Sequence, residues 1–172
     1  MSFWKQKHVV VTGGYGFIGS HLVERLLEAG ANVKIADFAP NDGARKNLQA
    51  VERDIEFQEA DLVDPQACGK ICRGADVVMH LAAKIRGVGY NVKHHGEMFF
   101  SNALMNLHMM EAARLESVDR FLCVSTVGVY PKDCEVPTPE EDGDILVLRT
   151  PSTPPLNPTA SISCEWREGD VW

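Results

Sequence analysis

Short apolar runs alternate along this chain with segments of helical periodicity. Residues 8–12 (HVVVT) form a β-branched run that ends in glycines, as a buried strand does. Residues 17–29 then repeat apolar positions every three or four residues, with Gly30 where a helix stop is expected. The predicted buried stripe of this helix is Ile18, Leu22, Val23, Leu26 and Leu27.

The same alternation continues to residue 125. We expect further strands over residues 31–37, 55–60, 75–82 and 120–125, and helices over 41–52, 65–74 and 97–116. Asp64 and Pro65 match an N-cap followed by proline at the first helical position. The last helix has Phe99, Leu104, Leu107, Met110 and Ala113 available for burial. Five strands separated by helices predict an α/β fold, a Rossmann-like doubly wound parallel sheet covered on both faces.

The composition changes after Tyr130. Seven of the nine prolines follow it, and only residues 144–149 (DILVLR) have the pattern of a strand there. The rest is typical of a loop. We therefore divide the chain into a Rossmann-like domain over residues 1–143, truncated on its C-terminal side, and an irregular Pro-rich tail over residues 144–172.

Composition narrows the class of protein. A length of 172 residues fits one domain, and the net charge of −7 argues against a nucleic-acid partner. No apolar run of about 18 residues is present, so we expect no membrane span. The N-terminal residues lead into a strand rather than a signal peptide. The five cysteines are odd in number, and Cys68 and Cys72 have the spacing of one helical turn. We expect reduced thiols and a cytoplasmic protein.

A glycine-rich turn joins the first predicted strand to the first helix. Gly14, Gly16 and Gly19 give the pattern G-x-G-x-x-G, and Asp37 ends the next strand about 20 residues later. Such a turn brings backbone N–H groups to a pyrophosphate, and the acid takes a ribose diol. A carboxylate would repel a 2′-phosphate, which favours NAD over NADP. A glycine turn without a ligand is the alternative, disfavoured by the matching strand, helix and acid.

Four stretches carry a family resemblance. They are residues 12–30 (TGGYGFIGSHLVERLLEAG), 61–62, 80–91 (HLAAKIRGVGYN) and 120–131 (RFLCVSTVGVYP). Together they resemble the NAD-dependent epimerase/dehydratase family of extended short-chain dehydrogenases/reductases. The segments AAKIRGVGYN and FFSNALMNLHMMEAAR are most similar to nucleotide-sugar epimerases of the GDP-mannose 3,5-epimerase and GDP-fucose synthase type. Gly128 stands where the former carry a catalytic cysteine, so the resemblance extends only to a nucleotide-sugar substrate.

The resemblance implies a role for each matching position. Thr126 would hydrogen-bond the substrate hydroxyl, with Ser125 beside it at the end of the fifth strand. Asp37 would bind the adenosine ribose. The other implied NAD contacts are Gly13, Gly16 and Gly19 at the pyrophosphate, Phe17 and Ile18 on the first helical turn, Asp61 and Leu62 at the adenine, and Leu81, Ala82, Ala83 and Lys84 along the ribose and phosphate.

Several of these residues also have purely structural interpretations. Asp61 is as well suited to forming a turn as to contacting adenine. Asn102 either fixes a loop through its amide or is a solvated helix residue. His80 follows a buried run and is interpreted as a satisfied core histidine. We expect residues 93–95 to be a solvated loop without a metal, and Met105, Met109 and Met110 to fill the core.

One expected feature is missing. Family members use a tyrosine and a lysine four residues apart for acid/base chemistry, whereas Tyr15, Tyr90 and Tyr130 are followed at that spacing by Gly19, His94 and Cys134. Three explanations stay open: a truncated or frame-shifted product, a fragment or splice form, and a genuine short NAD-binding module. The change in composition favours the first. Because the tyrosine–lysine pair is absent, we expect negligible turnover, and a homodimer stays open.

Overall fold

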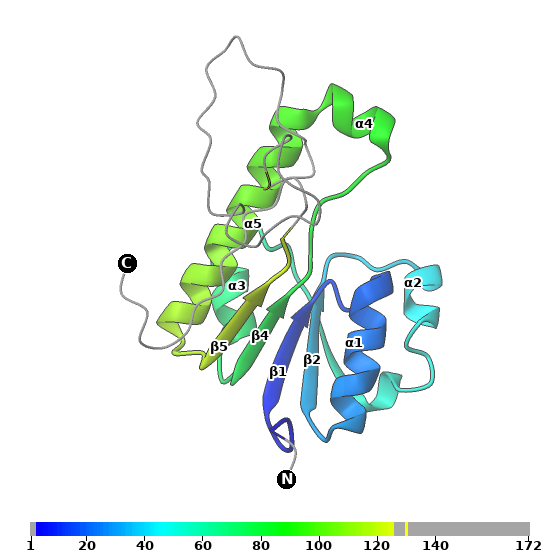
Figure 1. Ribbon diagram of the computed structural model, residues 1–172, viewed down its shortest axis with the longest axis vertical. Helices are drawn as coiled ribbons and strands as arrows, with labels where there is room; N and C mark the ends of the chain where they lie inside the picture. The colour runs from blue at the N-terminus through cyan, green and yellow to red at the C-terminus, as the bar shows by residue number, and fades with distance from the viewer. Residues whose placement is uncertain (1–2, 126–129, 131–172) are drawn as a thin grey trace.

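A five-stranded parallel sheet forms the centre of the computed structural model, which describes residues 3–125 and 130 (Figure 1). Its strands are β1 (His8–Thr12), β2 (Asn32–Asp37), β3 (Ile55–Glu59), β4 (Val77–His80) and β5 (Arg120–Cys123). They lie in the order β3-β2-β1-β4-β5. Because the order reverses between β1 and β4, the sheet has a topological switch point there, where α/β proteins bind ligands.

The strand register brings two polar residues together at the switch point. Val9 of β1 pairs with Val77 of β4, so that Thr12 lies opposite His80 at the carboxyl ends of both strands. On the other side of β1, Thr12 lies opposite Ala36 of β2. The segments that follow β1, β2 and β4 therefore leave the sheet at the same edge.

The helices cover both faces of the sheet (Figure 1). They are α1 (Phe17–Glu28), the short α2 (Asp42–Lys46), α3 (Pro65–Cys72), α4 (Val88–Lys93) and α5 (His95–Leu115), with a 3₁₀ turn at Glu52–Asp54. Val10 of β1 lies in a core with residues of α3 and α5. Its neighbours Val9 and Val11 lie in a second core with α1. This alternation confirms the doubly wound α/β fold.

Local signals explain several element boundaries. The Asp64 carboxylate accepts a hydrogen bond from the Gln66 amide at 2.9 Å, with Pro65 at the first position of α3. Gly30 follows α1 with a φ of +87°, which a glycine adopts without strain. Cys68 and Cys72 are both fully buried on α3 as free thiols. The predicted N-cap and the helical placement of this cysteine pair are thus confirmed.

Two predicted elements are wrong in part. The helix expected over residues 41–52 stops at Lys46, after a first turn capped by Asn41, whose side chain accepts from the Ala44 amide at 2.9 Å. The loop expected over residues 93–95 does not form, because α4 ends at Lys93 and α5 begins at His95. Polar residues without an apolar stripe gave no reliable signal in either segment.

The buried face of α5 differs in part from the prediction, although Ala113 is buried as expected. Phe99 and Leu107 are each 53% exposed, whereas Met98, Met105 and Met109 are buried. Apolar residues surround this helix, so periodicity could not select a face. The expectation that Met105 and Met109 fill the core is confirmed, and Met110 packs against the same core. On α1, Ile18 is 64% exposed rather than buried, since it lies in the open first turn.

Candidate functional site

The glycine-rich turn after β1 is shaped by close backbone contacts. Gly13 has a φ of +67°, and a Cβ on it would lie 3.0 Å from the backbone of Ala82, in the segment after β4. A Cβ on Gly19 would collide with the carbonyl oxygen of Gly13. Glycine is therefore required at both positions for the turn to pack between β4 and α1.

The start of α1 is open to a ligand. Gly16 is its N-cap and supplies no side-chain hydrogen bond, and the first turn holds no acidic residue. The first N–H groups of a helix have no partner within the helix, and they lie at the positive end of its dipole. Phe17, the first residue of the helix, is 80% exposed. An anion is therefore the ligand that this helix end favours.

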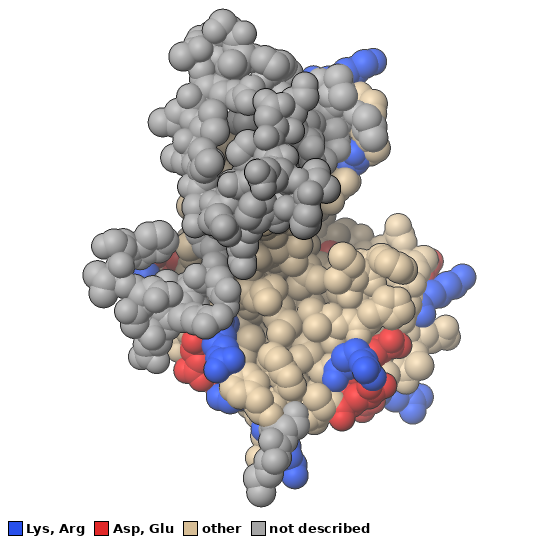
Figure 2. All heavy atoms as spheres, in the orientation of Figure 1, with Lys and Arg blue, Asp and Glu red and all other residues tan. Residues whose placement is uncertain are grey.

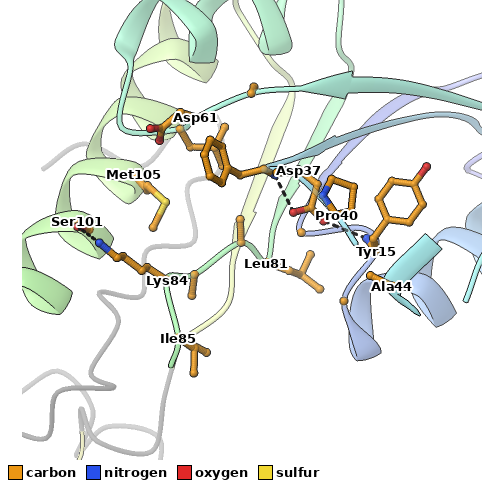
Figure 3. A pocket seen from close by; sticks show the side chains of 18 of the residues that line it. Tyr15, Asp37, Pro40, Ala44, Asp61, Leu81, Lys84, Ile85, Ser101 and Met105 are labelled. Atoms are coloured by element: carbon orange, nitrogen blue, oxygen red, sulfur yellow. Dashed lines mark hydrogen bonds between the residues drawn. The ribbon is translucent and has the colours of Figure 1, made fainter. Parts of the chain in front are cut away.

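Asp37 lies directly beside the glycine turn. One carboxylate oxygen accepts from the Tyr15 amide at 3.2 Å, and the other accepts from the Phe38 amide at 2.8 Å. Burial raises the pKa of Asp37, opposed by these two backbone hydrogen bonds. The Tyr15 ring packs against Phe57, with 5.4 Å between ring centroids, and its phenol points away from Asp37 (Figure 3). The turn is thus left open.

A cleft of about 940 Å³ opens along this edge of the sheet (Figure 3). Its size falls within the roughly 300–1,000 Å³ typical of ligand sites. The sequence-predicted residues that line it come from the segments after β1, β2, β3 and β4: Gly13, Gly16, Asp37, Asp61, Leu62, Leu81, Ala82, Ala83 and Lys84. Phe17, Ile18 and Gly19 lie in the adjoining first turn of α1 but are not among the lining residues.

Asp61 and Leu62, in the segment that follows β3, combine a structural position with a place in the cleft. Asp61 accepts a hydrogen bond from the Val63 amide at 3.0 Å, which makes it a turn former. It is nevertheless exposed and lines the cleft. Leu62 is 4% exposed and belongs to the core beneath. The two interpretations of Asp61 are compatible, because its second carboxylate oxygen is not used by the turn.

Lys84 is fixed by three residues of α5. Its ammonium lies 2.7 Å from a carboxylate oxygen of Glu97 and donates to Ser101 at 3.5 Å, so the side chain points toward α5 (Figure 3). Its backbone N–H donates to the Asn102 amide oxygen at 2.7 Å, and its carbonyl accepts from the Asn102 amide nitrogen at 3.2 Å. Asn102 therefore fixes a loop, one of its two predicted roles.

His80 is buried as expected but is not fully satisfied. Its Nδ1 lies 2.7 Å from the Thr12 hydroxyl, whereas its Nε2 makes no hydrogen bond of standard geometry within the part of the chain that the structure describes, although the Asn106 side chain lies close enough to affect the pKa of the ring. Burial lowers the pKa of His80 to about 4, only partly opposed by the Asn106 amide. The ring is therefore neutral over the physiological range.

Ser125 follows the end of β5, and Thr126 lies outside the described residues. The Ser125 hydroxyl is buried and has no hydrogen-bond partner among residues 3–125 and 130. Ser125 does not line the cleft. Of the two residues that the resemblance places near the substrate, the structure thus describes Ser125 alone.

Sequence reasoning missed part of the cleft wall. The missed lining residues include Phe38, Ala39 and Pro40 after β2, Ile85 and Arg86 after β4, and Ser101 and Met105 on α5. The segments after β2 and β4 could have been found, because chain leaving the carboxyl end of a strand lines this crevice. Among the described residues, no three metal-ligating side chains cluster, and no helix is both long and apolar enough to cross a bilayer.

The chain matches a known family and several characterised proteins. Residues 9–154 match the "NAD dependent epimerase/dehydratase family". GDP-mannose 3,5-epimerase 1 of Oryza sativa subsp. japonica is 31% identical over 76% of this chain and 34% of its own length. UDP-glucose 4-epimerase of Erwinia amylovora is 32% identical over 75% and 40%. The chain thus spans about a third to two fifths of the length of these relatives.

Solved structures agree with these matches. An epimerase from Methanothermobacter thermautotrophicus has a TM-score of 0.71 and 34% identity, covering 81% of this chain and 41% of that chain. A UDP-N-acetylglucosamine 4-epimerase from Methanobrevibacter ruminantium M1, in complex with UDP-N-acetylmuramic acid, has a TM-score of 0.69 and 31% identity. That likeness covers 79% of this chain and 43% of the other.

Proposed function

The chain belongs to the NAD dependent epimerase/dehydratase family, and from that membership we propose that it binds NAD in the cleft at the switch point. The pyrophosphate would rest on the N–H groups that begin α1. The adenosine ribose would hydrogen-bond to Asp37, and the adenine would lie near Asp61 and Leu62. The observation that carries this proposal is the hydrogen bond from the Tyr15 amide to Asp37, which places the acid beside the glycine turn.

The residues present fit a dinucleotide. A Cβ on Gly13, Gly14 or Gly19 would meet neighbouring atoms at 3.0 Å or closer, which accounts for the bare backbone at the turn. The open helix start offers donors to phosphate oxygens, and Asp37 offers an acceptor to a diol. Its negative charge, close to the turn, favours NAD over a cofactor with a 2′-phosphate.

We further propose a nucleotide-sugar epimerase or dehydratase ancestry for the site, because the relatives are named as epimerases of nucleotide sugars. Bound NAD would supply a hydride acceptor that later returns the hydride. Thr126, with Ser125 beside it, would orient the sugar hydroxyl. The sequence offers no tyrosine with a lysine four residues later to take the hydroxyl proton. General-base help of roughly 10²- to 10⁴-fold is therefore absent, and we expect negligible turnover.

Calorimetric titration of the purified chain with NAD tests this function. We expect micromolar binding of NAD, weaker binding of NADP, and no conversion of GDP-mannose or UDP-glucose. Gly69→Ala is a control variant that should bind NAD as the wild type does, because a Cβ at this position meets nothing within 4 Å and Gly69 lies outside the cleft. A folded chain that does not bind NAD would contradict the proposal and favour a non-functional fragment, and measurable epimerase activity would contradict the predicted inactivity.

The cellular setting and assembly are also proposals. Cys68 and Cys72 are buried thiols without a disulfide, which fits a reducing compartment such as the cytoplasm. Burial raises the pKa of Cys68 to about 11 and that of Cys72 to about 12, so neither is a reactive thiolate at neutral pH. The exposed Phe99, Phe100 and Leu107 on α5 support a homodimer.

A further inference from the structure

Thr12 lies at the centre of a buried hydrogen-bond network between β1 and β4. It is fully buried, and its hydroxyl oxygen lies 3.1 Å from the Leu81 amide and 3.1 Å from the Ala82 amide. The same oxygen lies 2.7 Å from His80 Nδ1. These three contacts join the last residue of β1 to the segment that forms the cleft wall after β4.

Hydrogen counting fixes the direction of each bond. A hydroxyl oxygen has one proton to donate and two lone pairs that accept. The Leu81 and Ala82 amides can only donate, so both direct their N–H groups at lone pairs of the Thr12 hydroxyl oxygen, and the Leu81 N–H is shared with the Thr12 carbonyl oxygen at 3.3 Å. The Thr12 proton must then be donated to His80 Nδ1, which accepts it. A neutral imidazole with Nδ1 as acceptor carries its own proton on Nε2.

The Leu81–Ala82 backbone forms the side of the cleft that faces the glycine turn. Both residues line the cleft, and the Ala82 backbone lies 3.0 Å from the place where a Gly13 Cβ would stand. A shift of this backbone by a few tenths of an ångström would change the space left for the pyrophosphate. The Thr12 hydroxyl contributes to its position by accepting from both amides, and the Thr12 carbonyl oxygen also accepts from the Leu81 amide.

We propose that Thr12 and His80 are positioning residues for the dinucleotide cleft: the neutral Nε2–H form of His80 orients the Thr12 hydroxyl, which holds the Leu81–Ala82 wall against the glycine turn. This inference rests on the proposed function and adds to it two residues that do not touch the ligand. Protonation of Nδ1 would remove the acceptor of the Thr12 proton. The Thr12 hydroxyl oxygen has no third lone pair for the new donor, so one of the two amides would lose its bond to the hydroxyl, although the Leu81 amide would keep the Thr12 carbonyl as an acceptor.

The surroundings of His80 keep it in this form. The groups that interact with its ring include Thr12 of β1, Asn106 of α5 and Phe121 of β5, and none of these three is charged. The Asn106 amide oxygen accepts from the Cys123 thiol at 3.6 Å. No neighbouring carboxylate among the described residues is available to stabilise an imidazolium, and burial holds the pKa of His80 well below its ordinary value.

Nitrogen NMR of the His80 ring tests the geometry without a variant. At neutral pH we expect the spectrum of a neutral imidazole protonated at Nε2, with a hydrogen bond at Nδ1. A ring protonated at Nδ1, or charged at pH 7, would overturn the inference. The Leu81 and Ala82 amide resonances should follow the His80 ring resonances when the pH is lowered below about 5, a coupling that a merely structural residue would not produce.

NAD titration of matched variants tests the consequence for binding. Thr12→Val removes the hydroxyl at nearly constant shape, and we expect the Kd for NAD to rise about tenfold or more. Thr12→Ser retains the hydroxyl and should restore binding to within about twofold of wild type. Asp76→Asn, which alters the ion pair with Lys7 at the other end of β4, is the control that changes stability without changing the Kd.

The outcomes separate this inference from the proposed function. If the folded wild-type chain does not bind NAD, the proposed function fails and the inference fails with it. If the wild type binds NAD and Thr12→Val binds it equally well, only the inference fails. If Thr12→Val does not fold, the ring spectrum of the wild type and the Kd of Thr12→Ser decide.

Discussion

Single residues decide what the cleft can bind, and Asp37 is the clearest case. Its carboxylate already accepts from two backbone amides, and burial raises its pKa above the value of an exposed aspartate. The ribose diol needs the ionised form as acceptor. NAD affinity should therefore fall as the pH drops through the raised pKa of Asp37, and this loss should begin at a higher pH than it would for an exposed aspartate.

Asp37→Asn tests this dependence. At pH 7 we expect the variant to bind NAD about one to two orders of magnitude more weakly and to discriminate less between NAD and NADP. Its affinity for NAD should also lack the decrease at low pH that protonation of Asp37 causes in the wild type. The measurement is the Kd for both cofactors between pH 5 and 8. An unchanged ratio of the two constants would show that this carboxylate does not meet the ribose.

A substitution at Gly16 should weaken ligand binding without preventing folding. Its φ of −68° suits any residue, and a Cβ there would meet only the Gly13 carbonyl oxygen, at 3.1 Å. We expect Gly16→Ala to fold with nearly normal stability and to bind NAD at least about tenfold more weakly, because a methyl group would stand at the phosphate. Gly19→Ala, by contrast, should prevent stable folding, since its Cβ would collide with Gly13.

His80 should make stability depend on pH. Its folded-state pKa of about 4 is lower than the 6.5 of a free histidine, so the unfolded state binds the extra proton first as the pH falls. The free energy of unfolding should then decrease from pH 6.5 toward 4, by up to about 3 kcal/mol from this group. Urea unfolding of wild type and His80→Gln at pH 7 and 4.5 measures the difference, which should be smaller in the variant.

At the scale of elements, the sequence predicted what its apolar pattern and capping residues determine. The five strands, α1 and α3 lie where expected, because buried strands read as continuous apolar runs and Asp64 and Gly30 mark helix ends. The predictions for α2 and for the face of α5 were wrong in part, since one segment has no apolar stripe and the other is apolar all round. The cleft wall at residues 38–40 was missed because no motif marks it, only the position after β2.

Two substitutions in and before α3 test how helix propensity and N-capping stabilise this helix. Gly69 lies inside this helix, and a methyl group added to it would have no atom within 4 Å, so Gly69→Ala should stabilise the chain by about 0.5–1 kcal/mol. Asp64→Ala removes the N-cap hydrogen bond and should cost about 1 kcal/mol. Thermal unfolding of both variants measures these shifts. A lower melting temperature for Gly69→Ala would contradict the argument from helix propensity, and an unchanged or higher one for Asp64→Ala would contradict the capping argument.

For the whole molecule, the arrangement of apolar surface bears on assembly. Figure 2 shows one face whose central area is largely uncharged, with the charged side chains toward its rim. Within the described residues, Leu122 on β5 is 46% exposed and Val124 is 42% exposed, in addition to the apolar residues of α5. Surface of this kind favours association. We expect sedimentation equilibrium to show a dimer, and Leu107→Lys on α5 to weaken it; a monomer at all concentrations would contradict the proposed homodimer.

The central claim is that a dinucleotide binds with its pyrophosphate at the start of α1 and its ribose at Asp37. Amide resonances recorded during a titration of the whole chain with NAD test this most directly. The account predicts saturable shifts at residues 13–19, at Asp37 and Phe38, and at Leu81 and Ala82. Shifts confined to other surfaces, or none at saturating NAD in a folded chain, would contradict it.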